Sequence, residues 1–227
     1  MDTNPNESLQ PHTRGIKSFI HSALAGVITG VARLATGVQV SWVGCRPDAA
    51  QRIYIANHTS HVDFALVWAS LPPELRANTR PIAAADYWEK GPLRRFIVHN
   101  LIHGVLIDRN RETRTEDPID KIVSALDGGY SLIAFPEGTR NTTDELLIPF
   151  KSGIYYVARR RPDVEVVPVW IENVNRVMPK GAFIPIPLLC SVTFGDPLRL
   201  APHEEKDTFI SRASHALLDL AARVHRV

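Results

Sequence analysis

Short apolar runs alternate along this chain with longer segments in which apolar side chains recur at helical spacing. The short runs are rich in β-branched and aromatic residues and predict strands at Val38–Val43, Arg52–Ala56, Arg80–Ala84, Gly104–Ile107, Ser131–Phe135, Val164–Trp170 and Ser191–Phe194. The helical spacing predicts helices between and after them, at Val62–Ser70, Pro92–Asn100, Pro118–Leu126, Gly153–Arg160 and Lys206–Val224.

This alternation favours an α/β fold with a central mixed, mainly parallel sheet flanked by helices. Pro118 at a first helical position and the pair Gly128-Gly129 beyond the end are typical helix boundaries. The 227 residues suffice for one ordinary domain with its own core, and no repeat or linker divides them. We expect one folded domain over residues 37–227, preceded by a segment over residues 1–36.

The segment before the domain combines a polar tail with an apolar stripe. Ser18–Ala32 contains no Lys, Arg, Asp or Glu, and its larger apolar side chains recur at helical spacing. The run is too short and too diluted by small and polar residues for a confident membrane span. It predicts an amphipathic helix that either packs on the core or lies among lipid headgroups, where Arg14, Lys17 and Arg33 would meet anionic lipid.

Composition and charge exclude several classes of protein. Hydrophobic residues at 44% and charged residues at 22% are ordinary for a globular chain and exclude disorder or coiled coil as the main state. Cys45 and Cys190 cannot form a disulfide framework, which favours a reducing compartment. The net charge of +2 gives no reason to expect nucleic acid as a partner. Basic residues do accumulate between Lys90 and Arg114, as on a solvated face or on a surface for an anionic ligand or membrane.

The turn after the strand Arg52–Ala56 contains the first group of reactive side chains, His58 and Asp63. Positions five apart on a regular helix are rotated by about 140°, so these two would not share a helix face. They can meet if His58 lies in the turn and Asp63 on the first helical turn, where functional groups often lie in α/β sheets. The carboxylate would then fix the imidazole tautomer and support general-base chemistry.

Two other interpretations of this turn stay open. His58 could cap the helix while Asp63 is a surface charge, or a metal ion could bind His58, His61 and Asp63. No further cluster of His and Cys with metal-ligand spacing completes such a site, so we predict that the protein holds no metal ion.

The second group of polar residues follows the strand Ser131–Phe135 and reads Pro136-Glu137-Gly138-Thr139-Arg140. Arg140 could hold a phosphate bidentately, and Glu137 could accept a hydrogen bond from a polyol hydroxyl. A simple surface turn would explain Gly138 and Thr139. A surface turn would not explain why Glu137 and Arg140 occur close to a further cation, Lys151.

Four segments resemble, in order and spacing, the motifs of the glycerolipid acyltransferase family, whose best-known members are 1-acylglycerol-3-phosphate acyltransferases. The segments are Asn57-His58 with Asp63, then Gly104–Arg109, Phe135–Arg140 and Val166–Val169, and the match spans about residues 50–200. Each motif alone is weak, but four in order are specific. The chain departs from the family at Ala84 or Ala85, where members often have Lys, and at Arg95, near a frequent Gly.

The resemblance implies a role for each motif residue. His58 would be the general base and Asp63 the residue that orients it, and residues 37–227 would form an acyltransferase domain that needs no cofactor. The acceptor substrate would be held by Gly104, Arg109, Glu137, Gly138, Thr139, Arg140 and Lys151.

The reaction implied by the resemblance is transfer of a fatty acyl group from acyl-CoA or acyl carrier protein to a hydroxyl of a lysophospholipid. The first expectation is 1-acylglycerol 3-phosphate giving phosphatidic acid, with another lysolipid or glycerol phosphate as alternative acceptors. A metal-dependent hydrolase and a non-catalytic lipid-binding protein stay open as other classes. Because such acceptors reside in bilayers, we expect a peripheral or monotopic protein on the cytoplasmic face of the inner membrane, with the membrane surface as a partner.

Overall fold

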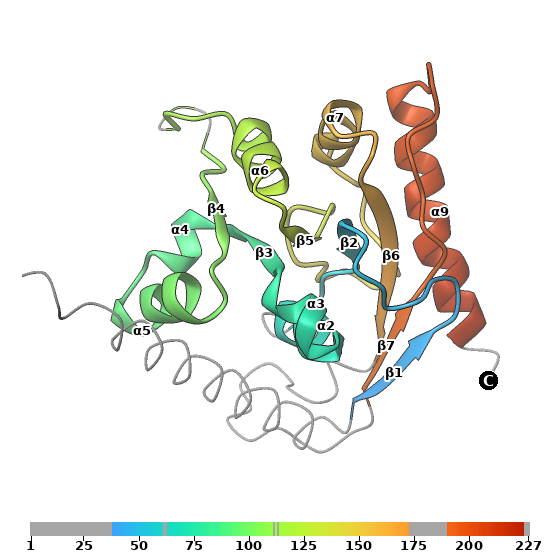
Figure 1. Cartoon of the computed structure of the whole chain (residues 1–227), viewed down its shortest axis with the longest axis horizontal. Coiled ribbons are helices and arrows are strands. Elements are labelled where there is room, and N and C mark those ends of the chain that lie inside the picture. Colours follow the sequence, from blue (N-terminus) through green and yellow to red (C-terminus); the bar gives the residue numbers. More distant parts are fainter. Residues whose placement is uncertain (1–37, 61–62, 111, 113, 173–189, 225–227) are drawn as a thin grey trace, which may run out of the picture.

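The computed structural model describes residues 38–60, 63–110, 112, 114–172 and 190–224 of the chain. In these residues seven strands form one sheet in the order β1-β7-β6-β2-β5-β3-β4 (Figure 1). The strands are β1 (Gln39–Trp42), β2 (Arg52–Ala56), β3 (Thr79–Ala84), β4 (Val105–Ile107), β5 (Ser131–Ala134), β6 (Glu165–Glu172) and β7 (Ser191–Phe194).

Five neighbouring strands of the sheet, β6, β2, β5, β3 and β4, are parallel to one another. At the other end of the sheet β7 pairs with β6 in antiparallel fashion, and β1 pairs with β7 in parallel. The predicted α/β fold with a mixed, mainly parallel sheet is therefore confirmed. All five residues of β2 are buried, as expected for a central parallel strand covered on both faces.

The helices connect these strands and flank the sheet. They are α2 (Asp63–Ser70), α3 (Pro73–Ala77), α4 (Ala85–Trp88), α5 (Pro92–Phe96), the π-helical turn η1 (Ile97–Leu101), α6 (Pro118–Asp127), α7 (Gly153–Arg160) and α9 (Lys206–Val224). The predicted helix Pro92–Asn100 is thus a short α-helix that widens into a π turn, in which Ile102 N donates to Ile97 O.

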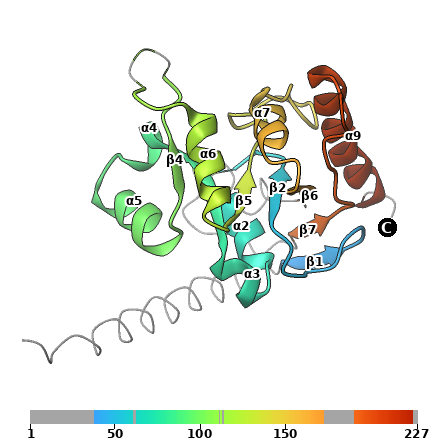
Figure 2. The same ribbon diagram turned by 45° about the horizontal axis from the view of Figure 1, so that its top comes forward.

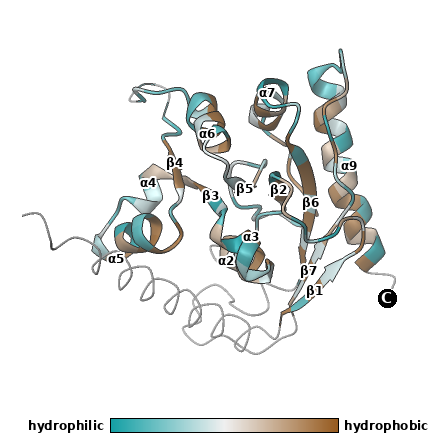
Figure 3. Ribbon diagram, viewed as in Figure 1, coloured by the Kyte–Doolittle hydropathy of each residue, from teal (hydrophilic) through white to brown (hydrophobic). Residues whose placement is uncertain are grey.

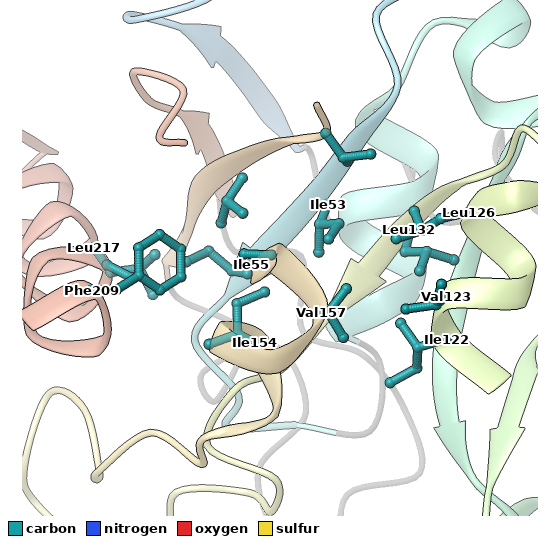
Figure 4. Packing of buried hydrophobic residues seen from close by; sticks show 14 of the residues in the cluster. Ile53, Ile55, Ile122, Val123, Leu126, Leu132, Ile154, Val157, Phe209 and Leu217 are labelled. Atoms are coloured by element: carbon teal, nitrogen blue, oxygen red, sulfur yellow. The ribbon is translucent and has the colours of Figure 1, made fainter. Parts of the chain in front are cut away.

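The main hydrophobic core lies between one face of the sheet and the helices α6, α7 and α9. Figure 4 shows Phe209 and Leu217 of α9 on one side of this core and Ile122 of α6 on the other, with Ile55 of β2 between them. Apolar and polar positions alternate along α9 (Figure 3), and its buried residues recur at helical spacing, at Phe209, Ala213, Leu217, Leu220 and Ala221. This packing fixes the parallel strands whose ends form the site.

A second core lies on the opposite face of the sheet, where α2 supplies Leu66 and Val67 and α3 supplies Leu75. The short helices α4 and α5 lie beyond the β3–β4 edge of the sheet, far from α9 (Figures 1 and 2). Because β2, β3, β4 and β5 are parallel, the loops after their carboxyl ends emerge at one edge of the sheet.

The predicted N-terminal helix Ser18–Ala32 lies outside the described residues, so the boundary expected at residues 36 and 37 stays a prediction. Among the residues that the structure describes, no helix has the length and apolar character needed to cross a membrane.

Candidate active site

The histidine and the aspartate after β2 meet as the sequence predicts. His58 Nδ1 lies 2.8 Å from Asp63 Oδ2, with His58 in the turn and Asp63 as the first residue of α2. A carboxylate only accepts hydrogen bonds, so Nδ1 carries the proton and Nε2 is the nitrogen with a free lone pair. The imidazole stacks on Phe135 at a centroid distance of 4.3 Å and is 21% exposed as a side chain. It can therefore accept a proton from a group in the adjacent cavity.

Asp63 is fully buried, so the interpretation of it as a surface charge is wrong. Its Oδ2 also accepts the backbone amides of Thr59 and Ser60, at 2.7 and 2.8 Å. Asp63 therefore organises the turn and orients the imidazole with the same oxygen atom. Its other oxygen, Oδ1, is buried and has no hydrogen-bond partner among the described residues.

Two buried polar side chains and one backbone amide tie this turn to its neighbours. Asn57 bonds both backbone groups of Ile171 in β6, through Nδ2 to the carbonyl at 3.0 Å and through Oδ1 to the amide at 2.8 Å. Glu137 Oε1 accepts the amide of His58 at 2.7 Å, and its Oε2 accepts the amide of Ile148 at 3.1 Å. On the other side of the peptide, the amide of Asn141 donates to the carbonyl of His58 at 2.6 Å.

Glu137 is only 1% exposed, and both of its oxygens are occupied by backbone amides. Burial raises the pKa of this carboxyl group, while the two amide bonds act in the opposite direction. Its expected role in holding the acceptor is therefore not visible in the geometry and stays a prediction.

Two adjoining cavities open at the carboxyl edge of the sheet. The first, about 290 Å³, is lined by His58, Phe135, Thr139 and Arg140 and by the aromatic residues Phe64, Tyr87 and Trp88. The second, about 370 Å³, is mainly apolar and reaches between the sheet and the helices α6 and α7, with Arg109, Arg114 and Lys151 among its lining residues. Arg109 and Gly138 line both cavities.

Arg109 lies at the junction of the two cavities and is held there by two contacts. Its Nε and Nη2 donate to the two oxygens of Asp86 at 3.1 and 2.6 Å, and its Nη1 donates to the carbonyl of Gly138 at 3.3 Å. The hydrogen bond from Arg109 lowers the pKa of Asp86. The guanidinium has five N–H groups, so further donors are left for a ligand.

Sequence reasoning missed Asp86. The signal available for it was an acidic residue two positions after the end of the predicted strand Arg80–Ala84, at the same sheet edge as His58.

The remaining predicted residues lie around these cavities, with one exception. Lys151 packs beside Gly138, where a Cβ atom would lie 3.1 Å from Lys151 Cγ, and the φ of 72° at this position favours glycine. Arg140 and Lys151 form no ion pair within the described part of the chain, so both charges are available to an anion. Gly104 lines neither cavity, and a Cβ there would lie 2.8 Å from Val98 Cγ2, which gives it a packing role.

No group of three or more His, Cys, Asp and Glu side chains with metal-binding geometry is found in the described residues. His61, the third ligand of the alternative metal site, lies outside them.

Fold and site together define a class: an α/β domain with a carboxylate-oriented histidine and a set of cations at the carboxyl edge of a parallel sheet. The model of the acyltransferase family matches residues 38–172, which is more than half of the chain. The chain therefore belongs to the acyltransferase family.

Several relatives named 1-acyl-sn-glycerol-3-phosphate acyltransferase are similar to this chain. The one from Limnanthes douglasii is 28% identical over 174 residues, which is 76% of this chain and 59% of the relative. The one from Saccharomyces cerevisiae is 30% identical over 67% of this chain and 50% of the relative, and the one from Salmonella typhimurium is 29% identical over 68% and 61%. The match thus spans between 50% and 61% of the length of these three relatives.

A solved structure shares the fold. The crystal structure of the 1-acyl-sn-glycerophosphate acyltransferase PlsC from Thermotoga maritima matches with a TM-score of 0.67, covering 94% of this chain and 85% of that one. At 21% sequence identity this likeness establishes the arrangement of helices and strands.

Proposed function

We propose that this protein is an O-acyltransferase that moves a fatty acyl group from an acyl thioester to a hydroxyl of a lysophospholipid. The single observation that carries the proposal is the buried Asp63 bonded to His58 Nδ1, beside a cavity lined by Arg109 and Arg140. The proposed acceptor is 1-acylglycerol 3-phosphate, and the product is phosphatidic acid. The names of the relatives support this choice of acceptor.

The chemistry follows from the geometry of the His–Asp pair. His58 Nε2 takes the proton of the acceptor hydroxyl while the hydroxyl oxygen attacks the carbonyl carbon of the thioester. The ionised Asp63 stabilises the imidazolium that forms. When the C–S bond breaks, the proton on His58 passes to the departing thiolate. The carbonyl oxygen regains its double bond, so the products are an ester and a thiol. No covalent acyl-enzyme is needed in this sequence.

The cations around the cavities fit a phosphate. Arg140 and Lys151 have no ion-pair partner among the described residues, and Arg109 keeps free N–H groups after its contacts with Asp86 and Gly138. Charge-assisted hydrogen bonds from such groups hold a phosphate strongly. The mainly apolar second cavity next to them fits a fatty acyl chain. Thr139 adds a hydroxyl to the first cavity.

Two motif residues are proposed to position the main chain of the site. Glu137 accepts the amide of His58 and thereby fixes the main chain that carries the base. Gly104 lets the chain before β4 pass close to Val98, which places the strand that leads to Arg109. In this proposal neither residue touches the substrate.

The proposed partners are acyl-CoA or acyl carrier protein as the donor and the membrane surface as the source of the acceptor. Because the acceptor is a single-chain lipid that partitions into bilayers, we propose a peripheral or monotopic protein on the cytoplasmic face of the inner membrane.

The test of the proposed function is a product analysis with the purified full chain. The protein is incubated in detergent with oleoyl-CoA or oleoyl acyl carrier protein and with 1-acylglycerol 3-phosphate, lysophosphatidylcholine, lysophosphatidylethanolamine or glycerol phosphate. Mass spectrometry then identifies the products. Phosphatidic acid is expected, and His58→Ala should lower its rate by roughly 10²–10⁴-fold, the usual contribution of a general base.

Exposed His215 on α9 supplies the matched control, because His215→Ala removes an imidazole far from the site and should keep full activity. Full activity of His58→Ala, or release of free fatty acid by a chelator-sensitive reaction, would refute the proposed function in favour of another class.

A further inference from the structure

Helix α5 is fully exposed although it carries large apolar side chains. None of its five residues is buried, and Leu93 and Phe96 are 70% and 50% exposed. The two residues are three positions apart and therefore lie on the same side of the helix. The other large apolar side chains that are exposed in the described residues lie elsewhere: Val43 follows β1, Leu146 is in the loop before α7, and Tyr156 is on α7. Figure 3 shows apolar and polar positions together in the α4–α5 region.

Basic residues flank these two apolar residues along the chain. Lys90, Arg94 and Arg95 are all exposed, and Glu89 is the acidic residue beside them, paired with Arg95 at 3.1 Å. The short segment from Glu89 to Phe96 therefore carries three positive charges and one negative charge, a surplus of two. Apolar side chains ringed by Lys and Arg are the pattern of a surface that enters the interface of an anionic bilayer.

This surface connects directly to the wall of the first cavity. The guanidinium of Arg94 lies 4.2 Å from the ring centroid of Tyr87, and its Nη1 donates to the carbonyl of Tyr87 at 3.5 Å. Tyr87 and Trp88 of α4 line the cavity that contains His58. A lipid surface held against α5 would therefore lie next to the aromatic wall of the cavity.

We propose that α5, with Leu93 and Phe96 at its centre and Lys90, Arg94 and Arg95 around them, is a docking surface for an anionic phospholipid bilayer. It delivers the single-chain acceptor along the Tyr87–Trp88 wall to His58. This inference rests on the proposed function and adds a defined surface to it. Burial of Leu93 and Phe96 in the interface supplies apolar contact, and the basic ring supplies selectivity for anionic lipid.

The experiment places a single reporter side chain on the surface of the full chain. Phe96→Trp is mixed with vesicles of phosphatidylglycerol or phosphatidylcholine whose acyl chains carry bromine, and the wild-type fluorescence is subtracted. Leu146→Trp is the matched control, because Leu146 is 53% exposed but lies outside α5. Binding of the chain through residues 1–36 alone would not give the expected signal, since quenching reports the depth of one side chain.

The brominated phosphatidylglycerol vesicles should quench the Phe96→Trp signal strongly and the Leu146→Trp signal little, with weaker quenching in phosphatidylcholine. Leu93→Ser combined with Phe96→Ser should lower the affinity for phosphatidylglycerol vesicles about tenfold or more. The same variant should keep its rate with detergent-dispersed acceptor.

Three results would overturn the inference. The first is a failure of α5 to enter the bilayer, seen either when the Phe96→Trp protein sediments with the vesicles but its fluorescence is not quenched, or when the protein does not sediment with them. The second is a blue-shifted Phe96→Trp emission before vesicles are added, which would assign α5 to residues 1–37 or to a second copy of the chain. The third is equal quenching by the two lipids. Absence of acyl transfer in detergent would instead refute the proposed function, so the two failures are distinguishable.

Discussion

Replacing Glu137 by Gln tests whether this buried carboxylate holds the turn of His58 or holds the substrate. The substitution keeps the size of the side chain but turns one of its two acceptors into an NH₂ group. One of the two amides, that of His58 or that of Ile148, then loses its acceptor inside the protein. An unsatisfied buried donor costs about 1–3 kcal/mol, and the other bond loses its charge assistance, worth roughly another 1 kcal/mol.

Glutamine also avoids the desolvation of a buried charge, which offsets part of this loss. The expected result is a free energy of unfolding lower by about 1–3 kcal/mol. The turnover number should fall by roughly 10–100-fold, because a base displaced by a fraction of an ångström reacts poorly. The Michaelis constant for the acceptor should change little.

Denaturant unfolding gives the stability, and acyl transfer well below the unfolding midpoint gives the kinetic constants of the folded protein. Glu145→Gln is the matched control in the same loop, because Glu145 is exposed and its contact with Asn141 uses the backbone carbonyl. A Glu137→Gln protein with normal stability and a raised Michaelis constant for the acceptor would refute the positioning role. It would support the acceptor-binding role that the sequence suggests.

The pH dependence of stability gives an independent check on Glu137. Burial raises its pKa in the folded state, so the folded protein binds the proton more tightly than the unfolded chain does. The stabilisation from this proton is complete below the ordinary glutamate pKa and is lost as the pH rises through the raised folded value. Glu137→Gln should remove this component, and unfolding curves recorded across that pH range measure it.

Three further predictions concern the cations and the N-terminal segment. Arg140→Gln or Lys151→Gln should raise the Michaelis constant for a phosphate-bearing acceptor about tenfold and leave the Michaelis constant for the thioester unchanged. An equal effect on acceptors without a phosphate would contradict a phosphate-binding role. Asp86→Asn should raise the Michaelis constant for the phosphate-bearing acceptor only a few-fold, since its ion pair with Arg109 is exposed. In a protein that already carries Arg109→Gln, adding Asp86→Asn should not change this constant further. Removal of residues 1–36 should move much of the protein to the soluble fraction. Flotation of the full and the truncated chain with vesicles measures this, and equal flotation of both forms would refute an anchoring role.

The parts of the fold that follow strong patterns could be predicted from the sequence. The bounds of β2 and α9 agree with the prediction, because a short run with four consecutive apolar residues after Arg52 and a long amphipathic helix leave clear signals. The helices α3 and α4 were not predicted, since elements of five and four residues are too short to show a period. The π turn after α5 was missed because a wider turn does not alter the apolar spacing enough to be seen.

The site divides in the same way. His58 and Asp63 could be paired from the sequence, since both follow a predicted strand and only one turn geometry lets them meet. The contacts of Asn57 with Ile171 and of Asp86 with Arg109 could not, because each joins residues from segments whose distance depends on the order of strands. Sequence spacing carries no information about which strand lies beside β2 or β3.

The polar residues of the motifs fall into a buried group and an exposed group, and the two groups have different roles. Asp63 and Glu137 are buried and accept hydrogen bonds from backbone amides, so each holds the main chain of a loop at the sheet edge. Arg140 and Lys151 are exposed and satisfy no carboxylate in the described residues. A change at a buried motif residue should therefore lower both stability and turnover. A change at an exposed cation should alter the choice of acceptor while the fold stays intact, so acceptor preference can vary without disturbing the His–Asp pair.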